Sequence, residues 1–192
     1  MDLLAFTGHK SLFGPTGTGG LYVREGVSLT PLLRGGTGSN SPHEIQPDFL
    51  PDALESGTAN AAGLAGLAAG VQFVSNIGAE IVAAHERKLV SHFIQSASQI
   101  EKLSLYGPPG AGARCGIVSF NVAGALPSEV CLILDERFSI MARPGLHCAP
   151  SAHRTLGTFP TGTVRFSFGW FNTMEQVDES LRALRRITAM VE

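Results

Sequence analysis

The hydrophobic pattern changes its period several times after residue 103, and this constrains the fold more than any other feature of the chain. Short apolar segments typical of strands cover residues 103–106 and 116–122, and a helical pattern covers residues 127–138. Two further strand-like segments, 140–143 and 164–169, precede a last helix. The order strand, strand, helix, strand, strand, helix predicts a small α+β sandwich.

The last helix is marked by signals at its start. Asn172 is a good N-cap residue, and Glu175 follows it at the spacing of a capping box. Apolar residues then recur at the period of a helix, at positions 177, 181, 184, 187 and 191. Both signals predict a C-terminal helix.

The first hundred residues contain segments of other kinds. Residues 3–6 and 20–23 predict buried strands on either side of a glycine-rich turn, whereas residues 27–52 show no period. Residues 60–76 are rich in alanine and leucine and predict a buried helix. Residues 79–100 predict an amphipathic helix whose apolar face holds Ile81, Ala84, Leu89, His92 and Phe93.

These segments predict a mixed α/β and α+β chain in three parts. Residues 1–60 are expected to form the edge of a larger α/β domain. Residues 61–102 are expected to be two connecting helices, and residues 103–192 the small C-terminal α+β domain.

Length, charge and cysteine content narrow the class of protein. The 192 residues suffice for one domain, or for one domain and part of another. The net charge of −2 gives no basic patch, so no nucleic-acid partner is expected, and no apolar stretch approaches the roughly 20 residues that cross a membrane. Three cysteines form neither an even disulfide framework nor a CxxC pair. With no signal-peptide pattern at the start, this predicts a cytoplasmic protein with reduced thiols.

Lys10 lies where an apolar segment enters the glycine-rich turn, and its setting allows two interpretations. It is either an exposed surface charge or an amine held close to an anion and an aldehyde. Thr7 and His9 flank it and could supply a hydroxyl and an imidazole N–H to a phosphate. A nucleotide-binding loop is disfavoured because no lysine follows the glycines, and Tyr22 stands where a third glycine is required.

Cys148 lies in a segment with proline and glycine on both sides, which predicts a loop. Arg143 and His147 could supply the positive setting that a reactive thiolate needs, and the alternative is a structural cysteine. Cys115 and Cys131 fit that structural interpretation. A metal site built from His147, Cys148 and His153 is disfavoured, because no second pair of ligands has zinc-site spacing.

Arg165 alternates with apolar residues in a predicted strand. A buried arginine is costly unless it meets an anion, and its planar fork suits a carboxylate. The alternative is an arginine on the solvent face of the strand.

Five motifs occur in a fixed order: TGHK–GPTGTGGLYV, GGTGSN, ESGTAN, ARPGLHCAP and GTVRFSFGWFNT. In this order they resemble the C-terminal half of class V aminotransferase-fold enzymes, which depend on pyridoxal 5'-phosphate (fold type I), and above all the Suf-type cysteine desulfurases. The resemblance covers essentially the whole chain. Members of that family are about twice as long, and part of their cofactor pocket lies in the other half.

The resemblance implies a role for each candidate residue. Lys10 resembles the Schiff-base lysine, with Thr7 and His9 as phosphate or lysine-loop contacts. Cys148 resembles the cysteine that takes sulfur from L-cysteine as a persulfide, leaving alanine. Arg165 resembles the arginine that binds the substrate α-carboxylate, with Arg143 as a second arginine at the same loop.

Gly57 and Thr58 resemble residues that reach the phosphate of the partner subunit's cofactor, which implies a homodimer. A sulfur-acceptor protein is a possible further partner. Two departures from the family pattern leave other functions open: Leu146 replaces the first histidine of His-His-Cys, and an arginine is missing near Ala53. These alternatives are another class V aminotransferase or lyase, including a selenocysteine lyase, or a truncated fragment without catalysis.

Overall fold

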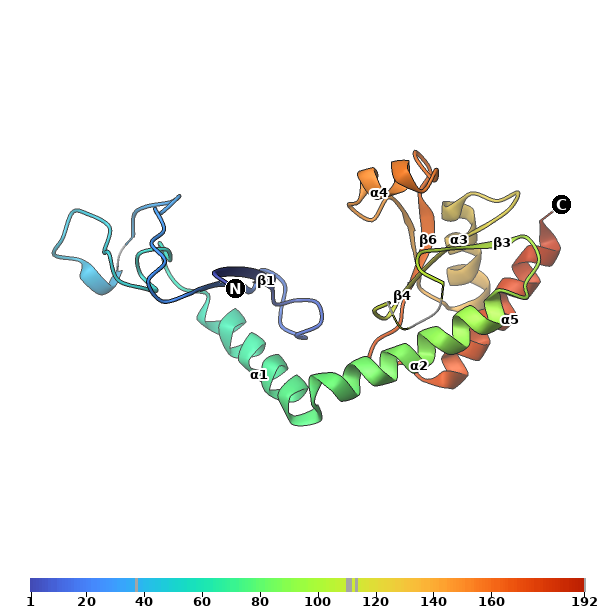
Figure 1. Cartoon of the computed structure of the whole chain (residues 1–192), viewed down its shortest axis with the longest axis horizontal. Coiled ribbons are helices and arrows are strands. Elements are labelled where there is room, and N and C mark those ends of the chain that lie inside the picture. The colour runs from blue at the N-terminus through green and yellow to red at the C-terminus, as the bar shows by residue number, and fades with distance from the viewer. Residues whose placement is uncertain (37, 110–111, 113, 192) are drawn as a thin grey trace. The chain divides into compact units, whose positions relative to one another are not determined.

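The computed structural model describes residues 1–36, 38–109, 112 and 114–191, and the chain forms two compact units. Unit 1 is Met1–Ile77 and unit 2 is Gly78–Glu192. Figure 1 shows both units. The boundary falls between the two helices that were predicted to connect the domains, so one of them belongs to each unit. Thr37, inside the GGTGSN motif, and residues 110–111 of a glycine cluster lie outside the described residues.

Unit 1 contains an antiparallel hairpin of β1 (Leu3–Thr7) and β2 (Gly19–Val23). Both strands were predicted, but the prediction that they are buried is wrong. Leu3 and Phe6 are 44% and 42% exposed, and Leu21 is 50% exposed. The physical reason is that the hairpin forms a sheet of two strands, and within the described residues no third strand pairs with it.

The helix of unit 1, α1 (Ala61–Ile77), follows Asn60, whose Oδ1 accepts a hydrogen bond from the backbone N–H of Gly63 at 3.0 Å. Only one side of this helix is buried, through Gly63, Leu67 and Gly70. The prediction of a buried helix is therefore wrong for the other side, where Leu64 is 48% exposed. A short 3₁₀ turn, η1 (Gly38–Asn40), lies in the segment that showed no period.

Unit 2 is built on a four-stranded antiparallel sheet with the order β3-β4-β6-β5. The strands are β3 (Leu103–Tyr106), β4 (Ile117–Val122), β5 (Arg143–Gly145) and β6 (Thr163–Ser167). The helices are α2 (Ala79–Ala97), α3 (Pro127–Phe138), α4 (Pro150–Thr155) and α5 (Met174–Met190). This confirms the mixed α/β fold class. The strand expected at 140–143 lies three residues later, and α4 was not predicted.

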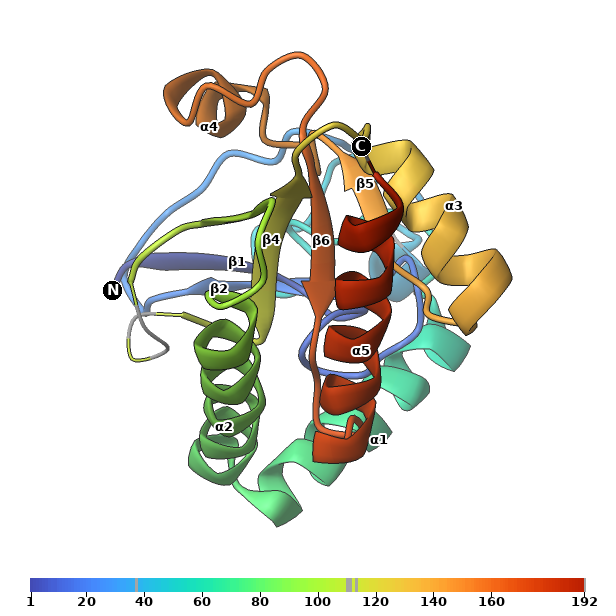
Figure 2. The same ribbon diagram turned by 90° about the vertical axis from the view of Figure 1, so that its right-hand side faces the viewer.

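The core of unit 2 lies between one face of the sheet and the helices. Phe93 of α2 packs on Phe120 of β4 and Phe166 of β6, with ring centroids 6.1 and 5.6 Å away. Figure 1 shows α2 and α5 side by side, with α4 on the side of β6 away from α3, and Figure 2 shows α5 running along β6. Because side chains alternate along a strand, the other face carries the polar residues of β4 and β6.

Two details of the helices differ from expectation. Ile81 was assigned to the apolar face of α2 but is 57% exposed, because the buried face begins at Leu89. The N-cap of α5 is Thr173 rather than Asn172: Thr173 Oγ1 accepts the N–H of Gln176, and Gln176 Oε1 accepts the N–H of Thr173. The Asn172 Oδ1 instead accepts the N–H of Gly169 at 2.9 Å, so it closes the preceding turn.

Candidate active site

Lys10 lies on a loop between β1 and β2 that backbone hydrogen bonds hold in shape. The N–H of Gly8 donates to the carbonyl of Thr18 at 2.8 Å, and the N–H of Gly14 donates to the carbonyl of Gly8 at 2.8 Å. The carbonyl of Lys10 itself accepts the N–H of Phe13 at 3.0 Å. The backbone around Lys10 is therefore fixed while its side chain stays exposed.

Glycines let this loop approach α1 closely. A Cβ at Gly8 would lie 2.9 Å from Leu67 Cδ1 of α1, and a Cβ at Gly66 of α1 would lie 2.6 Å from Pro15 Cγ. Gly70 of α1 faces the backbone carbonyl of Leu12 in the same way. Real Cβ atoms do not come this close, so the glycines of α1 are the surface on which the lysine loop rests.

The groups beside Lys10 are a hydroxyl and an imidazole. Thr7 Oγ1 and His9 Nδ1 are hydrogen-bonded at 3.0 Å, and Lys10 makes no ion pair with any residue that the structure describes. Gly57 and Thr58 are exposed, and the N–H of Gly57 donates to the carbonyl of Gly36 at 3.2 Å. The roles implied for these residues stay predictions.

In unit 2 the two candidate arginines are cross-strand partners. Arg143 of β5 lies opposite Arg165 of β6, so both side chains project from the same polar face of the sheet. Arg143 is exposed, whereas Arg165 is half-buried and its Nε has no hydrogen-bond partner within the described residues. Arg165 thus lies on the polar face of the sheet with its Nε buried, and its carboxylate-binding role stays a prediction. An anion placed between the two guanidinium groups would offset their repulsion.

Cys148 lies three residues after the end of β5, in an unusual backbone conformation. His147 and Cys148 have φ values of 51° and 60°, in the left-handed region that costs a residue with a side chain roughly 1–2 kcal/mol. The N–H of Ala149 donates to the carbonyl of Leu146 at 2.8 Å, and Pro150 then starts α4. This tight turn leaves the thiol of Cys148 exposed. Cys131, by contrast, is buried, and burial raises its pKa to about 11. A thiol with so high a pKa is inert near neutral pH, as is typical of a structural cysteine.

His147 connects the cysteine turn to the arginines. Its Nε2 is 2.9 Å from the carbonyl of Arg143, to which it donates as an N–H. Burial lowers the pKa of His147, the hydrogen bond to Arg143 opposes this, and the positive groups of Arg165, His153 and Arg143 lower it further. His147 is therefore a neutral imidazole near pH 7, with Nδ1 able to accept a proton.

The structure brings four predicted residues together in unit 2: Arg143, His147, Cys148 and Arg165. Three others, Thr7, His9 and Lys10, share one loop of unit 1. Sequence reasoning assigned no role to Asn121 or Thr163, each of which has a buried side-chain oxygen, and it considered His153 only for the disfavoured metal site. Polar and apolar residues alternate over residues 119–122 of β4 and along β6, and this alternation indicates that Asn121 and Thr163 lie on the polar face.

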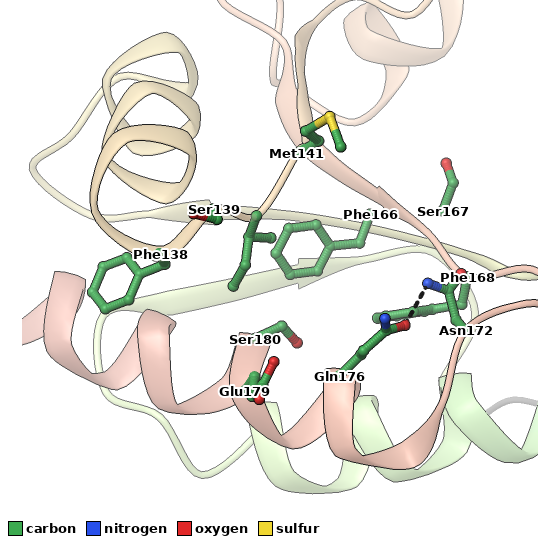
Figure 3. A pocket seen from close by; sticks show the side chains of 11 residues that line it. Phe138, Ser139, Met141, Phe166, Ser167, Phe168, Asn172, Gln176, Glu179 and Ser180 are labelled. Carbon is green, nitrogen blue, oxygen red and sulfur yellow. Dashed lines mark hydrogen bonds between the residues drawn. The ribbon is translucent and has the colours of Figure 1, made fainter.

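A separate cavity of about 380 Å³ lies on the helical side of the sheet, between β6 and α5 (Figure 3). Phe138, Met141, Phe166 and Ser180 help to line it. Phe166 and Arg165 are neighbours on β6, so their side chains project from opposite faces. This cavity is therefore not part of the arginine and cysteine site.

The residues that the structure describes form neither a cluster of metal ligands nor a single helix that could span a membrane. No three His, Cys, Asp or Glu side chains are grouped closely enough there to hold a metal ion. The rings of His147 and His153 lie 5.9 Å apart, and His153 Nδ1 is hydrogen-bonded to Thr158 Oγ1 at 2.7 Å. No single described helix is long and apolar enough to cross a membrane, and α1 and α2 meet the criterion only when their lengths are combined.

A model of the aminotransferase class-V family matches residues 1–179. The chain belongs to the aminotransferase class-V family. A probable cysteine desulfurase of Pyrococcus abyssi is 38% identical over 192 residues, covering 97% of this chain and 46% of the relative. A cysteine desulfurase of Haloferax volcanii is 35% identical over 187 residues, covering 95% of this chain and 43% of the relative.

Solved structures of cysteine desulfurases share the fold of this class V chain. The apo enzyme from Thermococcus onnurineus superposes with a TM-score of 0.83 at 35% identity, covering 98% of this chain and 47% of that one. The Escherichia coli enzyme CsdA superposes with a TM-score of 0.85 at 30% identity, covering 100% and 47%. The chain thus spans about half the length of the curated relatives it matches, and the family and fold class expected from the five motifs are confirmed.

Proposed function

We propose that this class V chain is part of a pyridoxal-phosphate-dependent cysteine desulfurase, which takes sulfur from L-cysteine, leaving alanine and a persulfide on Cys148. One observation carries the proposal: Cys148 occupies a strained, exposed turn directly after a strand on which Arg143 faces Arg165. A nucleophile and one arginine thus lie in one short segment, and the second arginine lies opposite on β6. The relatives named above are cysteine desulfurases, which supports the choice of this chemistry.

The family depends on pyridoxal 5'-phosphate, and the lysine loop of unit 1 fits one end of it. Lys10 offers an exposed amine without an ion pair among the described residues, and Thr7 and His9 offer hydrogen bonds for a phosphate or for the loop. When bound, this cofactor accepts the electron pair released at the substrate α-carbon. Gly57 and Thr58 are proposed to reach the phosphate of a partner subunit's cofactor.

Lys10 has two tasks in this proposal. Its amine would hold the cofactor when the cofactor is bound, because an amine is the side-chain group that binds an aldehyde. It then carries a proton to and from the substrate α-carbon, which requires the fixed backbone and free side chain described above. The hydrogen bonds around Gly8 supply that fixed backbone.

Cys148 acts on the sulfur and Arg165 on the carboxylate. The Cys148 thiolate attacks the sulfur of L-cysteine, so an S–S bond forms while the C–S bond breaks and its electron pair stays on the substrate carbon. Protonation of that carbon completes alanine. Arg165 binds the α-carboxylate, which fixes the amino acid while the sulfur reacts. His147, neutral with Nδ1 free to accept, is the group in the turn that can take the thiol proton.

One observation favours a second function. Leu146 precedes His147, so the turn lacks one imidazole of the cysteine desulfurase pattern. Another class V aminotransferase or lyase reaction, in which Cys148 takes no part, is the alternative. Both reactions use Lys10 and Arg165 alike, and only the first requires the thiol.

The two functions are distinguished by whether the sulfur of L-cysteine is transferred to Cys148. The native polypeptide that carries this chain, given pyridoxal phosphate and L-cysteine, is expected to release alanine and gain 32 Da on Cys148, roughly one sulfur atom. Cys148→Ser should abolish the persulfide and leave cofactor binding intact. Keto-acid formation that persists in Cys148→Ser would establish the alternative.

We further propose a homodimer in the cytoplasm that passes sulfur to an acceptor protein. Large apolar side chains are highly exposed in the segment before Gly57: Leu32 is 96%, Leu33 is 72% and Ile45 is 77% exposed. Such exposure is typical of an interface. Light scattering that gives a monomer mass for the native polypeptide would contradict the dimer.

A further inference from the structure

Three buried polar atoms on the polar face of unit 2 have no hydrogen-bond partner within the described residues. They are Asn121 Oδ1, Thr163 Oγ1 and Arg165 Nε. Thr163 is only 1% exposed, so solvent does not reach its hydroxyl freely. Buried polar atoms in folded proteins are almost always hydrogen-bonded, and three of them on one face point to a shared partner.

The sheet register brings these atoms close together. Phe120 lies opposite Val164, which places Asn121 of β4 opposite Thr163 of β6. Arg165 is two residues further along β6, and its side chain therefore projects from the same face. Cross-strand neighbours have Cβ atoms about 4.5–5.5 Å apart and diagonal neighbours about 7–8 Å, so one water-sized molecule can touch all three side chains.

The chemistry of the three atoms selects a neutral molecule. The Nδ2 of Asn121 donates to the carbonyl of Gly162 at 3.2 Å and points to the hydroxyl of Tyr106 at 3.5 Å, which leaves Oδ1 as an acceptor. Arg165 Nε–H is a donor, and the Thr163 hydroxyl can donate or accept. An anion would be repelled by Asn121 Oδ1 and a cation by Arg165. A molecule that both donates and accepts fits, and water is the smallest such molecule.

We propose that Asn121, Thr163 and Arg165 form a built site for one ordered water molecule, which makes Asn121 and Thr163 positioning residues for Arg165. The water accepts from Arg165 Nε and donates to Asn121 Oδ1. This holds the Nε edge of the guanidinium against the sheet and leaves its two terminal amino groups for an anion. That last step rests on the proposed function, in which Arg165 binds the substrate carboxylate.

The first test asks whether Thr163→Val lowers or raises the melting temperature of the whole chain. Thr163→Val keeps the shape of the side chain and removes only the hydroxyl. If Thr163 Oγ1 takes part in the water site, the variant should melt about 2–4 °C lower, whereas removal of an unpaired hydroxyl leaves stability unchanged or raises it. Thr163→Ser, which keeps the hydroxyl, is the matched control and should stay closer to the wild type. An unchanged or raised melting temperature for Thr163→Val overturns the site.

The second test measures how fast the Arg165 Nε–H exchanges with solvent. In ¹⁵N spectra of the chain, the Arg165 Nε–H signal, assigned by its loss in Arg165→Lys, should exchange slowly with solvent. Exchange should become several-fold faster in Thr163→Val, but not in Thr163→Ser. An exchange rate that is the same in the wild type and in Thr163→Val contradicts a shared water.

Neither measurement depends on catalysis, so the water site and the proposed function can each be contradicted without the other. A native polypeptide that makes no persulfide counts against the proposed function and leaves the water site standing. Normal persulfide formation with an unaltered Arg165 Nε–H in Thr163→Val removes the water site and leaves the function standing. If both proposals hold, Thr163→Val also raises KM for L-cysteine several-fold with a smaller effect on kcat, because the water positions the arginine that binds the carboxylate.

Discussion

Arg143 and Arg165 lie directly opposite each other on β5 and β6, and their side chains share one face of the sheet. Like charges at this position destabilise an antiparallel pair. Both guanidinium groups also act on His147, because their positive charges help to lower its pKa. The carboxylate proposed to bind Arg165 would offset this repulsion.

The repulsion between these two arginines predicts that Arg143→Gln stabilises the chain. The expected gain in the free energy of unfolding is about 0.2–1 kcal/mol at low ionic strength. Because salt screens exposed charges, the gain should shrink between about 0.01 M and about 1 M salt. Urea unfolding at both salt concentrations measures this, with Arg87→Gln on the exposed side of α2 as the control. A gain that is equal at both salt concentrations would show that charge repulsion is not its cause.

The sequence predicted much of the fold, because periodicity reports which side of an element meets the core. The helix at Pro127–Phe138 and the strand at Leu103–Tyr106 have the predicted bounds. The six-residue α4 was missed because it is too short for a period to develop. The strand pair at β1 and β2 was predicted to be buried because its residues are apolar, whereas burial depends on neighbours that a pattern does not reveal.

The candidate site was predictable only where neighbours in sequence are neighbours in space. Lys10 with Thr7 and His9, and Cys148 with His147, are such cases. The opposition of Arg143 and Arg165 depends on strand register across 22 residues of chain, including the unpredicted α4. The unpartnered atoms of Asn121 and Thr163 also come from two distant strands, so no local motif marks them.

Cys131 should be the slowest of the three cysteines to react with iodoacetamide. Burial raises its pKa from 9.0 to about 11, so its thiolate fraction at pH 8 falls about a hundredfold, and the surrounding core also blocks access. Cys115 and Cys148 are exposed and should be alkylated first. Mass spectrometry of peptides over time measures this. In denaturant the three rates should converge, and a fast reaction of Cys131 in the folded chain would contradict its burial.

His147 should make the stability of the chain depend on pH. Its pKa is lowered by folding, so the unfolded chain binds the proton more readily. The stabilising contribution of neutral His147 is therefore complete above about pH 6.5, its ordinary value, and is lost as the pH falls through the lower value of the folded state. His147→Gln should show a shallower loss of unfolding free energy between neutral and mildly acidic pH. His43→Gln, at an exposed position, is the control and should follow the wild type; identical pH profiles for His147→Gln and the wild type would contradict the prediction.

Gly70→Ala should destabilise the chain although alanine is the better helix former. Helix propensity alone favours the substitution by about 1 kcal/mol. The new Cβ would meet the backbone carbonyl of Leu12, which cannot move without displacing the loop that carries Lys10. Overpacking of this kind costs about 1–3 kcal/mol, so a net loss in unfolding free energy is expected. Ala68→Gly, on the exposed side of the same helix, calibrates the propensity effect. In addition, the amide signals of residues 8–18 should shift in Gly70→Ala but not in Ala68→Gly, and a stabilised Gly70→Ala with unshifted loop signals would show that the lysine loop does not rest on α1.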